Sequence, residues 1–315
     1  MMDDGTIAVL QIMATVLLNL SLAGMIGIYA SRICLQRSTS SWVRSLDRPL
    51  SVAWFAAILL ALLASGVTLW LEATSMAGVS VFEAWLAVRS VLETTHYGHV
   101  WLFGASALLV VLVSSTRLIG GKFSAGAQLI VGTSLAIFAL SRTLVSHAVI
   151  NGDATWAVAV DWIHLVLISL WVGEVLVAGF IVLNPPIGDE PAGRTDAAMY
   201  VNSLSTSATV ALSGIVLTGL LNAARGIGTV GNLMGNQYCD VLLVKLALVG
   251  LAVILGGLNR FRVMPELLGA FNSAEKPFAK PQRAFVQILK LEAVVLVAVT
   301  IAAAILSATA PPTAM

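Results

Sequence analysis

Eight long apolar segments, separated by short polar connections, run along the 315 residues of this chain. Each segment is about as long as the roughly 20 apolar residues that a helix needs to cross a bilayer. The pattern predicts an all-α integral membrane protein with eight transmembrane helices, folded as a single polytopic domain over residues 1–315. The predicted spans are approximately 6–31, 50–75, 97–116, 125–150, 155–183, 199–224, 239–260 and 285–308.

Composition supports the lipid bilayer as the solvent of this chain. Hydrophobic residues make up 58% of the sequence and charged residues only 10%, whereas soluble domains carry about a quarter charged residues. The formal net charge of +1 excludes a strongly basic surface, so no nucleic-acid partner is expected.

Lysine and arginine gather in alternate connections, which predicts the orientation. The opposite connections hold little more than Arg89 and Arg225. Because cytoplasmic loops are rich in basic residues, both termini are expected on the extracytoplasmic side. The basic set is Arg32, Arg37, Arg44, Arg48, Arg117, Lys122, Arg194, Arg260, Arg262, Lys276, Lys280 and Arg283.

Residues 80–95 are too short and too polar to span a membrane. Phe82, Trp85, Leu86 and Leu92 recur at helical spacing within this segment. This spacing predicts a short amphipathic helix on the outer membrane surface.

All four histidines fall toward the predicted extracytoplasmic face. His96 and His99 are three residues apart, on one face at the start of the third span. His147 is expected about 6 Å inside the outer end of the fourth span, and His164 about 13 Å down the fifth. Neutral imidazole is the commonest metal ligand, so the four rings predict a metal site. The alternative is that His96 is merely interfacial and that His147 and His164 form hydrogen bonds between helices.

Two acidic residues accompany His164 on the fifth span. Asp161 lies one turn away on the same face, where it could fix the imidazole tautomer or simply reach water. Glu174 lies about 15 Å deeper, so it is expected to be protonated, paired with a cation such as Arg142 or Lys245, or lining a hydrated path.

The other charged residues within the spans are Arg142, Lys245 and Glu292. Arg142 and Lys245 are interpreted as structural counter-ions, and Glu292 as part of a translocation path. Met76, Met234 and Cys239 belong to the outer side and could bind soft Cu(I), although packing is the alternative role. The sequence has no Walker A loop, HExxH or Cys-x-x-Cys motif, so it is not expected to be an enzyme.

Several of these positions together resemble the copper resistance protein D family (CopD, also called PcoD). The resemblance covers about residues 140–312, and the first four spans match only in topology. Glu174 stands where the family has the second glycine of a Trp-x-Gly-Gly motif, and Cys239-Asp240 stands where a glycine usually follows the tyrosine. The residues that carry the match are Ser146-His147-Ala148, His164, Leu170-Trp171-Val172-Gly173, Ser213-Gly214, Tyr238, Lys245, Asn259-Arg260, Glu292 and Pro311-Pro312.

The resemblance implies a multi-pass protein of the bacterial inner membrane that moves copper from the periplasm toward the cytoplasm. It also implies a periplasmic copper-binding partner of the CopC type. The residues alone predict an outer-facing histidine site, and the identity of copper as the bound ion comes from the family.

Two other interpretations remain open. Paired histidines on facing helices could hold haem b in a membrane redox protein. Alternatively, the chain could bind copper as an assembly or sensing subunit without transporting it.

Overall fold

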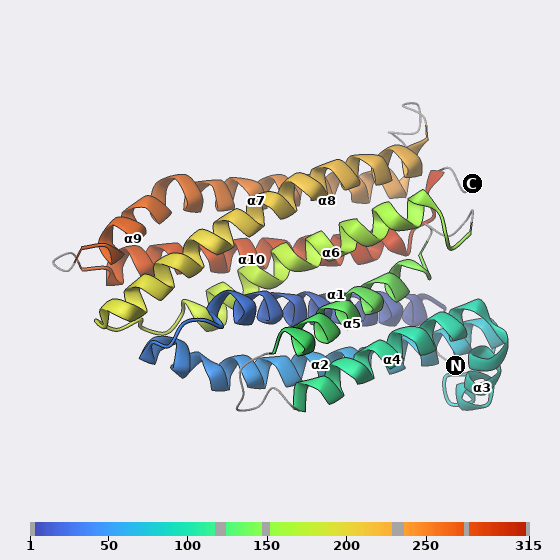
Figure 1. Ribbon diagram of the computed structural model, residues 1–315. Helices are drawn as coiled ribbons and strands as arrows, with labels where there is room; N and C mark the ends of the chain where they lie inside the picture. The colour runs from blue at the N-terminus through green and yellow to red at the C-terminus, as the bar shows by residue number, and fades with distance from the viewer. Residues whose placement is uncertain (1–3, 117–123, 147–151, 229–235, 274–276, 313–315) are drawn as a thin grey trace.

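The computed structural model describes residues 4–116, 124–146, 152–228, 236–273 and 277–312. Two predicted metal ligands, His147 and Met234, lie outside these ranges. Within the described residues the chain is built from helices (Figure 1). They are α1 (Asp4–Leu35), α2 (Ser41–Ala77), α3 (Ala84–Thr94), α4 (His96–Thr116), α5 (Ala125–Thr143), α6 (Trp156–Val177), η2 (Ala178–Val182), α7 (Pro191–Ile227), α8 (Gln237–Leu258), η4 (Asn259–Val263), α9 (Met264–Phe271) and α10 (Ala279–Ser307).

Eight of the described helical segments are long and apolar enough to cross a membrane, which confirms the predicted number of spans. The sixth span is longer than expected: α7 begins at Pro191 rather than near residue 199. Proline is favoured in the first turn of a helix because its missing N–H has no helical partner there. The amphipathic segment is helical as predicted, at α3.

Side-chain caps define where several of these helices begin. Ser40, Ser124, Thr155 and Asn236 each accept a hydrogen bond from the backbone N–H three residues further on. Such caps satisfy one of the N–H groups that the first helical turn leaves without a partner. The Thr155 cap fixes the start of α6, the helix that carries Asp161, His164 and Glu174.

Helix α1 lies in the middle of the bundle and packs against α6 and α2 (Figure 1). Helix α4 packs on α5, α7 packs on α6, and α8 packs on α10. One continuous set of buried apolar side chains extends from α1 and α2 to α7 and α10. Helix α6, which carries Asp161, His164 and Glu174, contacts α1, α5, α7 and α10.

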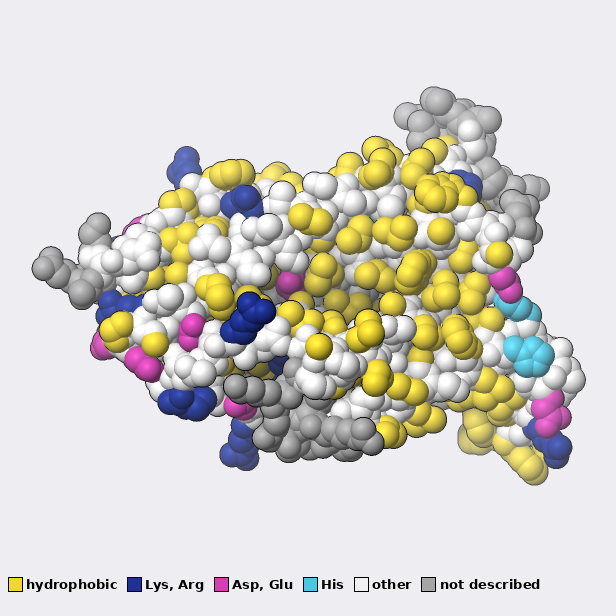
Figure 2. All heavy atoms as spheres, viewed as in Figure 1, with side chains coloured by type: hydrophobic (Ala, Val, Ile, Leu, Met, Phe, Trp, Pro, Cys, Tyr) yellow, Lys and Arg dark blue, Asp and Glu magenta, His cyan; other side chains and the backbone are white. Residues whose placement is uncertain are grey.

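Both ends of the chain lie at the same end of the bundle, the end at which α3 also lies (Figure 1). Figure 2 shows that most Lys and Arg side chains of the visible face gather at the opposite end, whereas the histidines lie at the end of the termini. This separation of charge agrees with the orientation that the positive-inside rule predicts. The end with the termini is called the outer end below.

In the described structure, helices α1 and α6 cross with their backbones in close contact. A Cβ added to Gly173 would lie 1.9 Å from the carbonyl oxygen of Ala23, and one added to Gly27 would lie 2.2 Å from the carbonyl carbon of Gly173. Only glycine allows two backbones to approach so closely, as is common between membrane helices. The crossing places the next residue, Glu174, against α1.

Candidate metal site

His164 lies in a polar part of the interface between α6 and α7. Its Nδ1 atom is 2.8 Å from the Thr218 hydroxyl oxygen, and that hydroxyl is 2.6 Å from the carbonyl oxygen of Gly214. A hydroxyl has one hydrogen to donate. Because the carbonyl can only accept, the Thr218 hydroxyl donates to Gly214 and accepts from His164 Nδ1–H. The Nε2 lone pair is then available to a metal ion.

Gly219 provides the room for this ring. A Cβ at Gly219 would lie 3.2 Å from Cε1 of His164, closer than side-chain carbons normally approach. Helix α7 therefore contributes both the hydrogen-bond partner and the space that hold the imidazole in one orientation. Orienting groups of this kind typically strengthen metal binding 10- to 100-fold.

Asp161 joins three helical segments near the outer end. Its Oδ2 atom accepts a hydrogen bond from the Ser146 hydroxyl (3.1 Å) and its Oδ1 atom accepts one from Asn222 Nδ2 (3.2 Å). Arg225 and Lys245 lie within electrostatic range of the same carboxylate. Asp161 was expected to fix the tautomer of His164, but Thr218 makes that hydrogen bond. Asp161 bonds instead to Ser146 and Asn222.

The α6–α7 interface is polar near both ends and apolar between them. The two helices run antiparallel, so each position of α6 faces a position progressively earlier in α7. Between the polar pairs, the apolar side chain of Leu167 packs against Gly214 and leaves no room for a Cβ on the glycine. The facing pairs from the outer end inward are Asp161 and Asn222, His164 and Thr218, Leu167 and Gly214, and Glu174 and Ser207.

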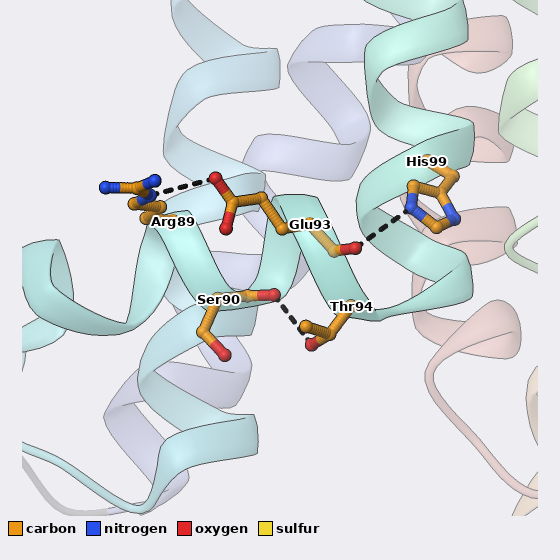
Figure 3. A network of polar contacts seen from close by, with 5 residues as sticks. All are labelled: Arg89, Ser90, Glu93, Thr94 and His99. Carbon is orange, nitrogen blue, oxygen red and sulfur yellow. Dashed lines mark hydrogen bonds and ion pairs between the residues drawn. The ribbon is translucent and has the colours of Figure 1, made fainter.

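His96 and His99 lie at the junction of α3 and α4, and both are exposed. His99 Nε2 donates to the carbonyl oxygen of Glu93 (3.3 Å; Figure 3). His96 Nε2 donates to the carbonyl oxygen of Leu144 (3.2 Å) and lies 3.5 Å from Asp153 Oδ1. Each ring keeps its Nδ1 atom for another partner.

The described residues contain no group of three or more His, Cys, Asp and Glu side chains placed to hold a metal ion. The prediction placed His147 inside the outer end of a fourth span that reaches residue 150, but α5 ends at Thr143. His147 therefore follows that helix in the sequence, and it lies outside the described ranges. A site shared by His164, His147, His99 and His96 therefore stays a prediction.

Glu174 lies deep in the bundle, with only 8% of its surface exposed. The Ser207 hydroxyl lies beside its carboxyl group, but the Oε2 atom has no hydrogen-bond partner among the residues described. Neither Arg142 nor Lys245 forms an ion pair with it in that part of the chain. The interaction of Lys245 is with Asp161.

Glu292 is also buried and pairs with a different residue of α6. Its Oε1 atom accepts a hydrogen bond from the Trp171 indole N–H at 3.1 Å. Gly256 of α8 faces the same carboxyl group, and a Cβ there would lie 3.3 Å from Oε1. The contact ties α6, α8 and α10 together midway along the bundle.

Arg142 lines a small cavity together with Tyr97, Trp101 and Ser141. Its Nε atom is buried without a hydrogen-bond partner among the described residues. Its guanidinium group lies within electrostatic range of the Tyr97 hydroxyl. It is therefore not the counter-ion of a carboxylate in the described structure.

Two of the soft ligands predicted from sequence, Met76 and Cys239, lie within the described residues. Met76 is half exposed near the end of α2. Cys239 is buried in the first turn of α8, where its N–H donates to the Asn236 side chain. Neither Cys239 nor Cys34 forms a disulfide.

Sequence reasoning located Asp161 and His164 but missed Thr218, Gly219 and Asn222. Thr218 and Asn222 are four residues apart on α7, and so share one helix face. A polar pair at that spacing in an apolar helix is the signal that could have found them.

Eight helices that are long and apolar enough to cross a membrane define the class as a multi-pass membrane protein. Family models refine this class. The model of the copper resistance protein D-like N-terminal domain matches residues 1–157, and that of copper resistance protein D matches residues 198–306. The chain belongs to the copper resistance protein D family. The N-terminal family model also matches the first four spans, where the residues alone resembled the family only in topology.

Two curated relatives agree with this assignment. Copper resistance protein D of Pseudomonas syringae pv. tomato is 28% identical over 303 residues, which cover 94% of each chain. Copper transport protein CutJ of Bacillus subtilis (strain 168) is 27% identical over 177 residues, which cover 55% of this chain but 32% of that relative. No solved structure matches the chain.

Proposed function

We propose that this protein transports copper across the inner membrane toward the cytoplasm, and that His164 is the central ligand of the outer copper site. The observation that carries the proposal is the hydrogen-bond chain from His164 Nδ1–H through Thr218 to Gly214, which leaves Nε2 available. Membership of a copper resistance family supports copper as the cargo. The name of the Bacillus subtilis relative, copper transport protein CutJ, supports transport.

Capture of copper at the outer end involves further residues. His147 is the expected second imidazole beside His164, and His99 and His96 form an exposed pair through which copper arrives. Met76, Met234 and Cys239 are additional soft ligands for Cu(I). A periplasmic copper-binding protein of the CopC type is the proposed donor to this surface.

The residues around His164 set the charge of the outer site. Asp161 supplies one negative charge, and Lys245 lies within electrostatic range of both Asp161 and His164. Lys245 balances the carboxylate when the site is empty. It also repels a bound cation, which favours release inward past Leu167 once the ion has entered.

On this proposal copper crosses the membrane chemically unchanged, and the protein is not an enzyme. From the outer site the ion follows the α6–α7 interface to Glu174, while Glu292 remains tied to Trp171 beside that route. Arg142 and Lys245 keep structural and electrostatic roles rather than binding the ion.

The test is copper uptake into liposomes that contain the purified protein. His164→Ala should reduce the uptake rate at least 10-fold, because it removes the ligand on which the outer site is built. The matched control is Val210→Ala, a change on the lipid-exposed face of α7, which should retain the rate of the unchanged protein.

The same preparation separates the alternatives. Copper bound by the protein without any uptake would identify an assembly or sensing subunit. A Soret absorption band, with sharp bands appearing on reduction, would identify haem b and contradict the proposal.

A further inference from the structure

A second group of chemically reactive side chains lies at the inner end of the same helix interface. Cys34 is in the last turn of α1, next to the final residue of that helix, and it is partly buried. The Ser203 hydroxyl of α7 lies beside its thiol. The Glu174 carboxyl group and the Tyr200 hydroxyl lie within electrostatic range of the thiol.

The group draws on three helices that the fold holds firmly together. Gly27 and Gly173 bring α1 and α6 into backbone contact one residue before Glu174. The Tyr200 hydroxyl shares a 2.9 Å hydrogen bond with Ser31, which fixes α7 against α1 beside Cys34. The thiol and the carboxyl group are therefore held near each other by the tightest contacts around α6.

Glu174 is the independent sign that this group takes a ligand. Nine-tenths of its surface is buried, and Oε2 has no hydrogen-bond partner in the described ranges. A buried polar atom without a partner is costly, and the bilayer core offers no water to replace that partner. A cation, which Oε2 could bind, would remove that cost.

We propose that Cys34 and Glu174 form an inner binding site for one Cu(I) ion, with hydroxyl groups of α7 beside them. The proposal rests on the proposed function, because the ion reaches this site from the outer one. The thiolate is the soft ligand that selects Cu(I), and the Glu174 carboxyl group supplies one oxygen to the ion while its other oxygen takes up the thiol proton.

Charge balance favours a monovalent ion here. When Cu(I) binds, the S–H bond of Cys34 breaks, an S–Cu bond forms, and the released proton passes to the Glu174 carboxylate. The ion brings one positive charge and the carboxylate held one negative charge, so the loaded site is neutral. Cu(II) would leave a net positive charge inside the membrane, which is costly.

Glu174 follows directly after Gly173 at the close crossing of α1 and α6. Tyr200 is the other titratable group that faces the pair, and its hydroxyl is already engaged with Ser31.

The test is the number of Cu(I) ions bound by the full-length protein in detergent. It is measured without oxygen, by competition with a Cu(I) chelator of known affinity. Cys34→Ser and Glu174→Gln should each bind one ion fewer than the unchanged protein, and His164→Ala should lose a different one. Glu266→Gln is the matched control, because that carboxylate is exposed on α9.

A second measurement follows the thiol directly. Ag(I), which resembles Cu(I) and is not reduced or oxidised here, should slow alkylation of Cys34 at least 10-fold, and Glu174→Gln should abolish most of that protection. Unchanged Cu(I) stoichiometry in both variants, or alkylation unaffected by Ag(I), would overturn the inner site. An unchanged protein that takes up no copper in liposomes would instead contradict the proposed function. The uptake assay and the binding assay therefore distinguish failure of the proposed function from failure of the inner site.

Discussion

The indole N–H of Trp171 on α6 donates a hydrogen bond to Glu292 on α10, with 3.1 Å between the two heavy atoms. Both side chains are buried, and they are separated by 121 residues of sequence. Both also belong to the family pattern read from the sequence. The contact explains why a tryptophan and a carboxylate are found together in this bundle: each satisfies a polar group of the other where water is absent.

Replacing Trp171 with Phe should lower the free energy of unfolding by about 2 kcal/mol, because Glu292 loses its buried donor. The measurement is thermal unfolding in detergent micelles. Trp156→Phe is the control, since Trp156 is 75% exposed. In a Glu292→Leu background the cost of Trp171→Phe should fall. An equal cost in both backgrounds would show that the hydrogen bond contributes nothing.

The α1–α6 crossing should be intolerant of a single added methyl group. Gly173→Ala places a Cβ 1.9 Å from the Ala23 carbonyl oxygen, so the two helices must separate at a cost of about 3 kcal/mol. The yield of monodisperse protein in size-exclusion chromatography should fall sharply. Gly250→Ala, where nothing lies within 4 Å, should accumulate normally; similar yields for both variants would contradict the close crossing.

Thr218 should influence copper affinity without touching the ion. Thr218→Val keeps the shape of the side chain and removes the acceptor for His164 Nδ1–H, so the affinity for copper should fall about 10- to 100-fold. Ser213→Ala on the same helix is the control, because its hydroxyl bonds only to the Thr209 carbonyl of its own helix. Equal affinities in the two variants would exclude a positioning role for Thr218.

The pH dependence of stability should reveal a contact at the inner end. The Ser41 hydroxyl and backbone N–H both donate to Glu190 and, with Arg44 nearby, lower the pKa of that carboxyl group. A carboxylate with a lowered pKa stabilises the fold above its unfolded pKa of about 4.3. This stabilisation is lost as the pH falls through the folded pKa.

Ser41→Ala should therefore reduce the melting temperature at pH 7, and the difference should shrink below about pH 4. Ser45→Ala, whose hydroxyl bonds to the Trp42 carbonyl oxygen, should show no such convergence. If Ser41→Ala lowers the melting temperature by the same amount at every pH, the Ser41–Glu190 contact is not the cause of the lost stability.

The sequence predicted the elements of the fold well, because the signals are local. Apolar length predicted eight spans, and apolar residues at helical spacing near Trp85 predicted the surface helix α3. Residue spacing along one helix also placed Asp161, His164 and Glu174 in the correct order of depth. Each of these inferences needs only the rise of a helix and the thickness of a bilayer.

Contacts between helices were not predictable in the same way. The partners of His164 and Asp161 depend on the register of α6 against α7, which Leu167 and Gly214 set through side-chain packing. For the same reason the sequence offered Arg142 or Lys245 as partners of Glu174, whereas the structure places Ser207 beside it. The proximity of Cys34 to Glu174 likewise depends on how α1 crosses α6, which the sequence does not reveal.

The central claim is that His164 binds copper through Nε2 at the outer end of α6, and X-ray absorption spectroscopy of the copper-loaded protein tests it most directly. The account predicts imidazole scattering around copper that weakens in His164→Ala, with the loss of one bound ion per chain. Identical spectra and stoichiometry for the unchanged protein and His164→Ala would contradict it.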